Sequence, residues 1–282
     1  MGLATRRQCL RHAIPFTTSY HTRYPEYLRA RWPIPTGLSY AWLRRFHGAA
    51  SRTFVSSRSL EAQLAQRGFR NLHLWQRGVD LRRFQPRAAA ESPAQLMSLP
   101  RPVMAYVGRL AVEKNLVAFL RLDLPGTQLI VGDGPLRAEL TARFPRAVFA
   151  GYQFGSELVA SLASADVFVF PSLTDTFGLA MLEAGACGVP VAAFPVPGPL
   201  DVIDDGVTGV LDRDLGKAIR NALQLDRGVC ARRAAAFTWG AATEQFLAGL
   251  EPIRVGVRSA LFVRRGSAMI APRQPSSAGD AN

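Results

Sequence analysis

The chain has 282 residues, of which 48% are hydrophobic and 20% charged. Domains usually span about 100–150 residues, so this length allows one large core or two modest ones, and the composition excludes disorder of the whole chain. The formal net charge of +13 indicates an anionic partner, either nucleic acid, a lipid headgroup surface or a phosphorylated substrate, unless it reflects a compositional bias toward arginine.

The cysteines and the apolar runs indicate in which cellular compartment the protein is expected. Cys9, Cys187 and Cys230 stand far apart and lack the spacing of a metal site, a redox site or a disulfide framework. No stretch offers the roughly 18–20 apolar residues of a membrane span, and no apolar signal-peptide run follows the basic start. We therefore expect a cytoplasmic protein, with peripheral attachment at the inner membrane face left open.

Residues 1–85 have the pattern of a partial Rossmann-like domain. Short β-rich runs predict strands over 16–20, 52–56 and 71–75. Amphipathic stretches predict helices over 26–31, 40–50 and 60–67, the last of them capped by the hydroxyl of Ser57. Three strands are few for a closed sheet of this type, so we expect only part of a domain here.

Residues 102–250 predict a complete doubly wound domain and make the fold class α/β. Nearly all-apolar runs, typical of strands covered by helices on both faces, lie at 102–107, 128–131, 147–150, 167–170 and 189–193. Helices are predicted between them over 136–144, 156–163 and 179–187. The proline-rich residues 86–101 predict a linker, and the aperiodic residues 251–282 predict a disordered tail.

Four loops of this second half each follow a predicted strand at its carboxyl end, where open parallel sheets bind ligands. In the first loop, Gly108 allows close backbone approach, and the cations Arg109 and Lys114 could grip a diphosphate. A solvated pair of cations on a surface loop is the ordinary alternative.

The second and third loops allow packing explanations as well. Gly132 and Gly134 bound a tight turn into a helix that we expect to begin at Pro135, because proline is tolerated at the first helical position. Gly151 and Tyr152 could pass beside a planar base. A plain strand-to-helix turn, or packing alone, would account for each.

The fourth loop, over 171–184, carries more information. Thr176, Phe177 and Gly178 would present unpaired backbone N–H groups at a helix start. Such groups, together with the helix dipole, form a site that favours a phosphate. Asp175 would repel that phosphate unless it accepts hydrogen bonds from sugar hydroxyls. Glu183 lies in an otherwise apolar segment and needs donors, either a ribose diol or an arginine.

Taken together, these segments resemble the donor domain of the family 4 GT-B glycosyltransferases over about 102–211. The motifs are Gly-Arg-Leu-x-x-Glu-Lys-Asn from Gly108, Gly-Asp-Gly-Pro from Gly132, an acidic residue followed by seven residues and Glu183, and Ala-Cys-Gly-Val-Pro-Val from Ala186. Two departures are Asp175, where the family usually has Glu, and the Pro195–Pro199 loop in place of a Gly-Gly-Pro-Glu-like loop. The shorter arm of Asp175 leaves its reach toward the sugar open, and the Pro195–Pro199 loop hints at a different acceptor or donor sugar.

The resemblance implies a role for each motif. Arg109 and Lys114 would hold the donor diphosphate, and Glu183 would bind the ribose. Asp175 would meet the sugar as a catalytic residue. The remaining donor contacts would come from Gly108 and from the backbone of Thr176, Phe177, Gly178 and Leu179, with Gly132, Gly134, Gly151 and Tyr152 near the base.

The early segment extends the resemblance. His21, in Ser-Tyr-His-Thr after a predicted strand, looks like the family's first-domain histidine that approaches the transferred sugar, although a lone histidine is more often structural. Arg77–Asp80 resembles the family's entrance to the second domain. By these motifs the opening strands of the first domain have no counterpart, so we expect a truncated or divergent GT-B protein.

The implied reaction is transfer of a hexose from a nucleotide diphosphate sugar to a lipid or saccharide hydroxyl with retention, with the departing phosphate assisting the acceptor. It requires no metal and no cofactor besides this co-substrate. The alternative is an inactive remnant that binds nucleotide sugar or serves as an interaction module. Nucleic acid is not expected, because that idea rests on charge alone. Residues 38–47 combine aromatic residues with Arg44 and Arg45, which suits either an anionic membrane surface or a helix packed on the sheet.

Overall fold

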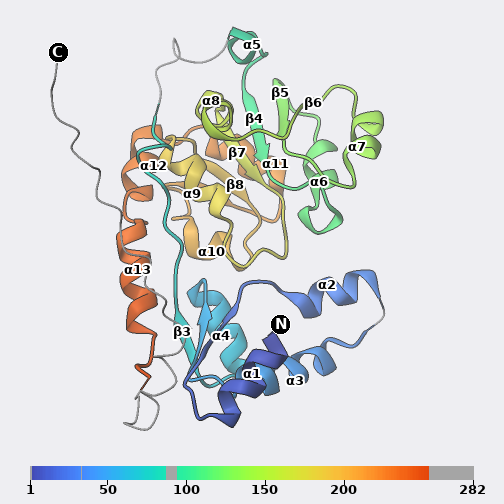
Figure 1. The fold of residues 1–282 in the computed structure, drawn as a ribbon. Helices are drawn as coiled ribbons and strands as arrows, with labels where there is room; N and C mark the ends of the chain where they lie inside the picture. Colours follow the sequence, from blue (N-terminus) through green and yellow to red (C-terminus); the bar gives the residue numbers. More distant parts are fainter. Residues whose placement is uncertain (1, 33, 87–93, 254–282) are drawn as a thin grey trace, which may run out of the picture. The chain divides into compact units, whose positions relative to one another are not determined.

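The computed structural model describes residues 2–32, 34–86 and 94–253. They belong to two units, whose helices and strands are labelled in Figure 1. The described residues of the smaller unit are 2–15 and 251–253, and they contain helix α1 (Gly2–Arg11). Of the predicted tail over 251–282, residues 254–282 lie outside the described residues. Phe16–Leu250 form the larger unit, which contains both sheets of the described chain.

The first sheet is parallel, in the order β1-β2-β3. Its strands are β1 (Thr17–Tyr20), β2 (Arg52–Val55) and β3 (Leu72–Leu74), and its helices are α2 (Tyr24–Arg31), α3 (Thr36–His47) and α4 (Arg58–Gln66). These elements confirm the predicted ones, with shifts of a few residues at the ends. The Ser57 hydroxyl accepts a hydrogen bond from the Leu60 amide at 3.3 Å, so the predicted cap of α4 is confirmed.

The second sheet is also parallel and has six strands in the order β6-β5-β4-β7-β8-β9 among residues 94–253. The strands are β4 (Val103–Val107), β5 (Thr127–Val131), β6 (Val148–Gly151), β7 (Val167–Phe170), β8 (Val191–Ala193) and β9 (Gly209–Leu211). The first five confirm the predicted strands. Strand β9 escaped prediction because three residues are too few for a hydrophobic period to show.

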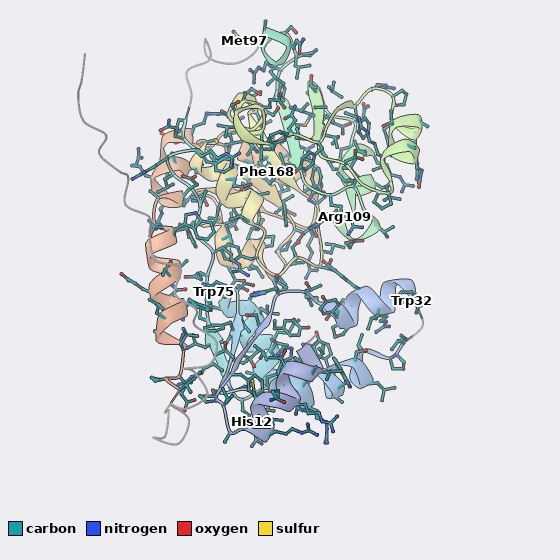
Figure 2. All side chains as sticks on the ribbon, viewed as in Figure 1. His12, Trp32, Trp75, Met97, Arg109 and Phe168 are labelled. Atoms are coloured by element: carbon teal, nitrogen blue, oxygen red, sulfur yellow. The ribbon has the colours of Figure 1, made fainter. Side chains whose placement is uncertain are left out.

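The apolar strands are explained by two cores, one on each face of this sheet. Alternate side chains of one strand point to opposite faces, so Phe168 of β7 enters one core and Val169 enters the other. Helices α8 (Gly155–Ser164), α9 (Leu179–Ala186) and α12 (Arg227–Ala234) supply the first core, and α6 (Leu116–Leu120), α7 (Arg137–Arg143) and α11 (Leu215–Ala222) supply the second. Phe168 lies in the middle of the sheet (Figure 2) and is fully buried. Truncating it to alanine would cost about 3–5 kcal/mol.

One predicted helix start is wrong. Helix α7 begins at Arg137 and not at Pro135. The amide of Leu136 donates to the carbonyl of Leu110 on a neighbouring loop at 3.1 Å, and the amide of Arg137 donates to Gly134. Residues 134–136 therefore form a turn tied to the loop after β4, which delays the helix.

The remaining elements are short or late in the chain. They are α5 (Ala94–Met97), the 3₁₀ helix η2 (Val112–Lys114), α10 (Pro199–Val202) and α13 (Trp239–Ala248). Helix α5 lies in the predicted linker, of which residues 87–93 lie outside the described residues. No helix in the described part of the chain is long and apolar enough to cross a membrane.

Helix α13 packs against the first sheet, although it falls within the predicted 102–250 domain. The Phe246 ring lies 5.0 Å from that of Phe54 and 4.9 Å from that of Trp75, between ring centroids. The Gln245 side chain accepts a hydrogen bond from the Gln76 amide at 2.8 Å. The chain thus returns to the first sheet after completing the second one.

Candidate functional site

The second sheet has its topological switch point between β4 and β7. From β4 the chain continues outward to β5 and β6, and from β7 it continues in the opposite direction to β8 and β9. The loops that follow the carboxyl ends of β4 and β7 lead in opposite directions from this point, and open α/β sheets usually bind ligands at the carboxyl ends of the strands at such a point. These are the first and fourth loops singled out in the sequence.

An ion pair joins these two loops. The Lys114 ammonium lies 2.7 Å from Oδ1 and 2.8 Å from Oδ2 of Asp175, and both side chains are largely buried. The pair bridges 61 positions of sequence because β4 and β7 are neighbours. The charge of Asp175 is therefore compensated, and a phosphate at this place would not face a bare carboxylate.

Arg109 lies on the loop after β4 (Figure 2), and its side chain is exposed. None of the hydrogen bonds and ion pairs found in the described part of the chain involves its guanidinium. Its backbone is held in place, because the buried Tyr106 hydroxyl donates to the Arg109 carbonyl at 3.0 Å. The fixed backbone and free guanidinium suit a cation that reaches toward an anionic ligand.

The second loop packs directly on the first one. The Gly108 amide donates to Val131 at 3.0 Å, and the Leu110 amide donates to Asp133 at 2.9 Å. A Cβ on Gly132 would overlap the carbonyl oxygen of Gly108. Backbone packing therefore accounts for Gly132, and its nearness to a base stays a prediction.

The third loop is exposed and aromatic. Gly151 ends β6, and its carbonyl accepts a hydrogen bond from the Gly132 amide at 2.7 Å. Tyr152 is 72% exposed, and its ring lies 6.3 Å from that of Phe154, which is 69% exposed. Two exposed rings beside the glycine loops offer a surface on which a planar base could stack.

The amino end of α9 has the predicted geometry of free amides. The helix begins at Leu179 after Gly178, which has φ 85° and ψ 64°. No hydrogen bond found among the described residues is donated by the amides of Thr176, Phe177 or Gly178. These amides and the helix dipole favour an anion at this end.

Glu183 lies in α9, one turn beyond this amino end, and is partly buried. Burial raises the pKa of its carboxyl, and the nearby Arg83 guanidinium offsets this in part. The carboxylate makes none of the hydrogen bonds or ion pairs found within the described residues. Arg83 is therefore close enough to act on the Glu183 carboxylate but forms no ion pair with it. The carboxylate oxygens can still accept hydrogen bonds from a ligand.

His21 follows β1, and its ring is held by Arg77. An Arg77 Nη lies 2.9 Å from His21 Nδ1, and Arg77 also stacks 4.3 Å from the centroid of the Trp75 ring. Burial and the Arg77 charge lower the pKa of His21 to about 4. The same Arg77 Nη also lies 3.3 Å from His21 Nε2, and since a guanidinium can only donate, the neutral ring accepts from Arg77 through a ring nitrogen.

Hydrogen bonds connect His21 to the fourth loop. The Thr176 hydroxyl donates to the His21 carbonyl at 2.9 Å, and the Ser56 hydroxyl donates to the Thr176 carbonyl at 3.0 Å. The Tyr27 side chain hydrogen-bonds that of Thr174, and burial together with the Asp175 carboxylate raises the pKa of Tyr27. The structure therefore brings His21, Thr176, Asp175 and Lys114 into one connected set.

Sequence reasoning missed several of these residues. Arg77 lay within a quoted motif but had no assigned role, and Ser56, Tyr27 and Tyr106 were not singled out. A serine after a strand, or a tyrosine in a strand or a helix, carries no signal by itself, so only the three-dimensional arrangement could have revealed these residues. No group of three or more His, Cys, Asp or Glu residues in the described ranges is arranged to hold a metal ion.

Comparison with known proteins covers both halves. Residues 1–83 match the family described as Glycosyltransferase Family 4, and residues 101–225 match the family described as Glycosyl transferases group 1. The chain is 36% identical over 215 residues to a GDP-mannose-dependent alpha-mannosyltransferase of Mycobacterium tuberculosis, covering 75% of this chain and 57% of the relative. A protein of the same name from Mycolicibacterium smegmatis is 38% identical over 240 residues, covering 80% of this chain and 63% of the relative. The chain thus spans less than two thirds of the length of these relatives.

Solved structures show the same fold. The Anabaena protein HepE in complex with UDP-glucose has a TM-score of 0.68 at 17% identity and covers 88% of this chain and 76% of its own. Sucrose-phosphate synthase from Thermosynechococcus elongatus has a TM-score of 0.65 at 24% identity and covers 88% of this chain and 68% of its own. With two parallel Rossmann-like sheets and both segments matched, the chain belongs to the group 1, family 4 glycosyltransferases of GT-B fold.

Proposed function

We propose that this protein transfers a hexose from a nucleotide diphosphate sugar to the hydroxyl of a lipid or saccharide acceptor, with retention at the anomeric carbon. The observation that carries the proposal is the Lys114–Asp175 pair at the switch point, beside the free amides at the start of α9. Cations and amide dipoles there would stabilise the negative charge that develops on the leaving diphosphate.

In this scheme the bond from the anomeric carbon to the diphosphate oxygen breaks, and a bond from that carbon to the acceptor oxygen forms on the same face. The acceptor proton passes to the departing phosphate. Arg109 and Lys114 hold the diphosphate, and Glu183 accepts hydrogen bonds from the ribose. Asp175 orients the sugar hydroxyls, and the neutral His21 ring faces the transferred sugar. No step of the scheme requires a metal ion or a cofactor.

Two kinds of donor deserve testing first, since relatives are named for GDP-mannose and a structural neighbour contains UDP-glucose. The test is calorimetric binding of both donors to the wild-type chain and to Lys114→Ala. The loss of one charge-assisted contact should weaken the preferred donor about tenfold or more. Unchanged affinity would remove the diphosphate assignment.

The chain supplies a matched control. Lys217 is its other lysine and also pairs with an aspartate, Asp212, at 2.8 Å, but on the exposed surface near α11. Lys217→Ala should leave donor affinity unchanged.

A second candidate is a nucleotide-sugar-binding module without turnover. It is favoured by the position of Arg109, Lys114 and Glu183, which all belong to the second sheet's loops and helices, so that donor binding alone would not require the first sheet. Release of labelled sugar from the bound donor distinguishes the two candidates. Binding without release would support the module.

A further inference from the structure

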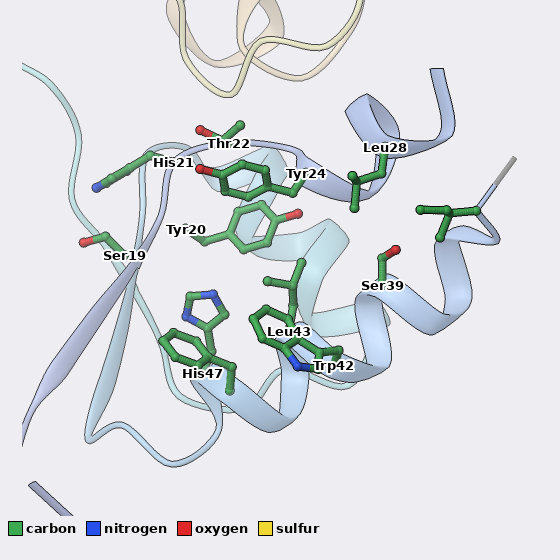
Figure 3. Close-up of a pocket in the computed structure, with 12 residues that line it drawn as sticks. Ser19, Tyr20, His21, Thr22, Tyr24, Leu28, Ser39, Trp42, Leu43 and His47 are labelled. Atoms are coloured by element: carbon green, nitrogen blue, oxygen red, sulfur yellow. The ribbon is translucent and has the colours of Figure 1, made fainter. Parts of the chain in front are cut away.

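A cavity of about 660 Å³ opens beside His21 in the first half of the chain. This volume lies within the range of about 300–1,000 Å³ that small-molecule sites usually enclose. Figure 3 shows Ser19 and His21 at one end and Leu28 and Ser39 at the other, with the ring of Tyr20 between them. The cavity therefore runs from the candidate site toward α2 and α3.

The wall of the cavity is apolar and carries no net charge. Leu28, Leu43 and Phe46 contribute aliphatic and aromatic surface, and Tyr20 and Trp42 contribute rings. His47 also lines it, but its Nδ1 is bonded to the Thr18 hydroxyl at 2.9 Å, and burial lowers the pKa of His47 to about 4, so the ring is neutral. Such a wall suits a hydrocarbon better than a sugar, because a buried sugar would leave its hydroxyls unpaired.

The outer residues have the composition of a membrane interface. Tyr24 and Trp42 line the cavity and are 57% and 55% exposed. Tyrosine and tryptophan are enriched where protein meets lipid headgroups. On the same helix, α3, Arg44 and Arg45 are exposed, and its sequence contains no acidic residue. This charge complements an anionic lipid surface.

We infer that the cavity takes the hydrocarbon chain of a membrane-lipid acceptor and so places the acceptor's polar head beside His21. The inference rests on the proposed function, from which it selects lipid over saccharide as the acceptor class. A lipid occupant accounts together for the apolar wall, the position next to His21, the exposed rings of Tyr24 and Trp42 and the cationic residues of α3. A further polypeptide segment would account for the wall alone.

Octyl, decyl and dodecyl maltoside, kept below the concentration of micelle formation, test the inference in binding experiments with the full chain. Affinity should rise about threefold to fourfold for each added methylene, since each buried methylene contributes about 0.8 kcal/mol. Absence of binding, or affinity independent of chain length, would overturn the inference and leave the cavity to a polypeptide occupant.

Matched variants locate the binding. Ser39→Trp fills the cavity and should weaken dodecyl maltoside at least tenfold, and the smaller change Ser39→Leu should weaken it less. Ala41→Trp places the same ring on the exposed side of α3 and should have no effect. Thermal melting of each variant shows that it is folded. Equal binding by Ser39→Trp and Ala41→Trp would contradict the assignment.

Two further measurements distinguish the lipid-acceptor inference from simple attachment to a membrane surface and from the proposed glycosyltransferase function. Flotation with vesicles that contain phosphatidylglycerol reports surface attachment, and attachment without binding of soluble alkyl maltosides would overturn the cavity assignment. Donor binding reports the proposed function independently. If the donor binds but no alkyl chain does, the lipid-acceptor inference falls and the glycosyltransferase proposal stands.

Discussion

Single residues at the site divide into those whose charge is compensated and those left open to a ligand. Asp175 is neutralised by Lys114, whereas Glu183 keeps a carboxylate that burial makes costly. A buried acceptor without donors is destabilising unless a ligand supplies them. The unpaired Glu183 carboxylate therefore lowers the stability of the ligand-free chain, and hydrogen bonds from a ribose diol would offset this cost.

His21 is the residue whose protonation the structure predicts most directly. Its pKa of about 4 lies below the ordinary 6.5, so folding favours the neutral ring. This contribution to stability is fully present above about pH 6.5 and is lost as the pH falls through the window toward about 4. In an NMR titration the His21 C2–H signal should not shift between about pH 8 and 5.5.

Replacing Arg77 by Gln tests the cause of this shift. It removes a cation that lowers the His21 pKa, so the pKa should rise but stay below the ordinary value because burial remains. Arg82→Gln, at an exposed position nearby, should leave the titration unchanged. A His21 ring that titrates near pH 6.5 in the wild type would contradict the geometry.

Sequence reasoning singled out some of the residues that the structure brings together, but it did not identify their partners. Lys114 and Asp175 were both expected to contact the donor, and nothing in the sequence indicated that they bind each other. That contact depends on β4 lying next to β7, which is a property of strand order. The same holds for Arg77 and His21, which are 56 positions apart.

Among the elements, the strands were easier to predict than the turns. Four-residue runs such as Val167–Phe170 are apolar on both faces, and this pattern alone indicates a central parallel strand. Helix α7 was misplaced at its start because Leu136 bonds to Leu110 of another loop. Long-range backbone contacts of this kind leave no local mark in the sequence.

The close packing of the loops after β4 and β5 gives a prediction at this scale. Gly132→Ala should destabilise the fold by about 1–3 kcal/mol, because its Cβ would overlap the Gly108 carbonyl and the backbone must shift. Since Gly108 leads into the loop of Arg109 and Lys114, which we propose to hold the diphosphate, donor affinity should also fall by roughly tenfold. Thermal unfolding and calorimetry measure the two effects.

Gly206→Ala is the control for backbone conformation. Gly206 also has a positive φ, 74°, but nothing lies within 4 Å of the position of its Cβ. It should cost only about 1–2 kcal/mol through strain and leave donor affinity unchanged. Equal loss of donor affinity in both variants would show that the loop contact has no part in binding.

Within the larger unit, hydrogen bonds connect the segments around the first sheet to loops of the second sheet. Thr176 and Ser56 link the fourth loop to the end of β1 and to β2, and the Ser59 amide donates to the Asp201 carboxylate at 2.8 Å. Helix α13 adds aromatic packing on the first sheet. The fourth loop is thus held partly by residues of the first half, and in the proposed function both halves would contribute to one site.

Thr176→Val tests this connection. It removes the hydrogen bond to the His21 carbonyl, which should cost about 1 kcal/mol of stability. Donor affinity should change less than about threefold, because the donor binds the loop through its backbone. The rate of transfer should fall about tenfold or more, because the sugar is no longer held in register with His21. Steady-state kinetics separate the change in kcat from the change in KM.

Ser56→Ala should act through the same loop, so the effects of the two substitutions on kcat should not add in the double variant. Thr243→Val provides the matched control, since the Thr243 hydroxyl donates at 2.8 Å to the Trp239 carbonyl within α13. It removes an equivalent hydrogen bond far from the donor loop in sequence and should leave kcat unchanged. If Thr243→Val lost as much kcat as Thr176→Val, the effect would come from general destabilisation. If the effects of Thr176→Val and Ser56→Ala on kcat were strictly additive, the two contacts would act independently.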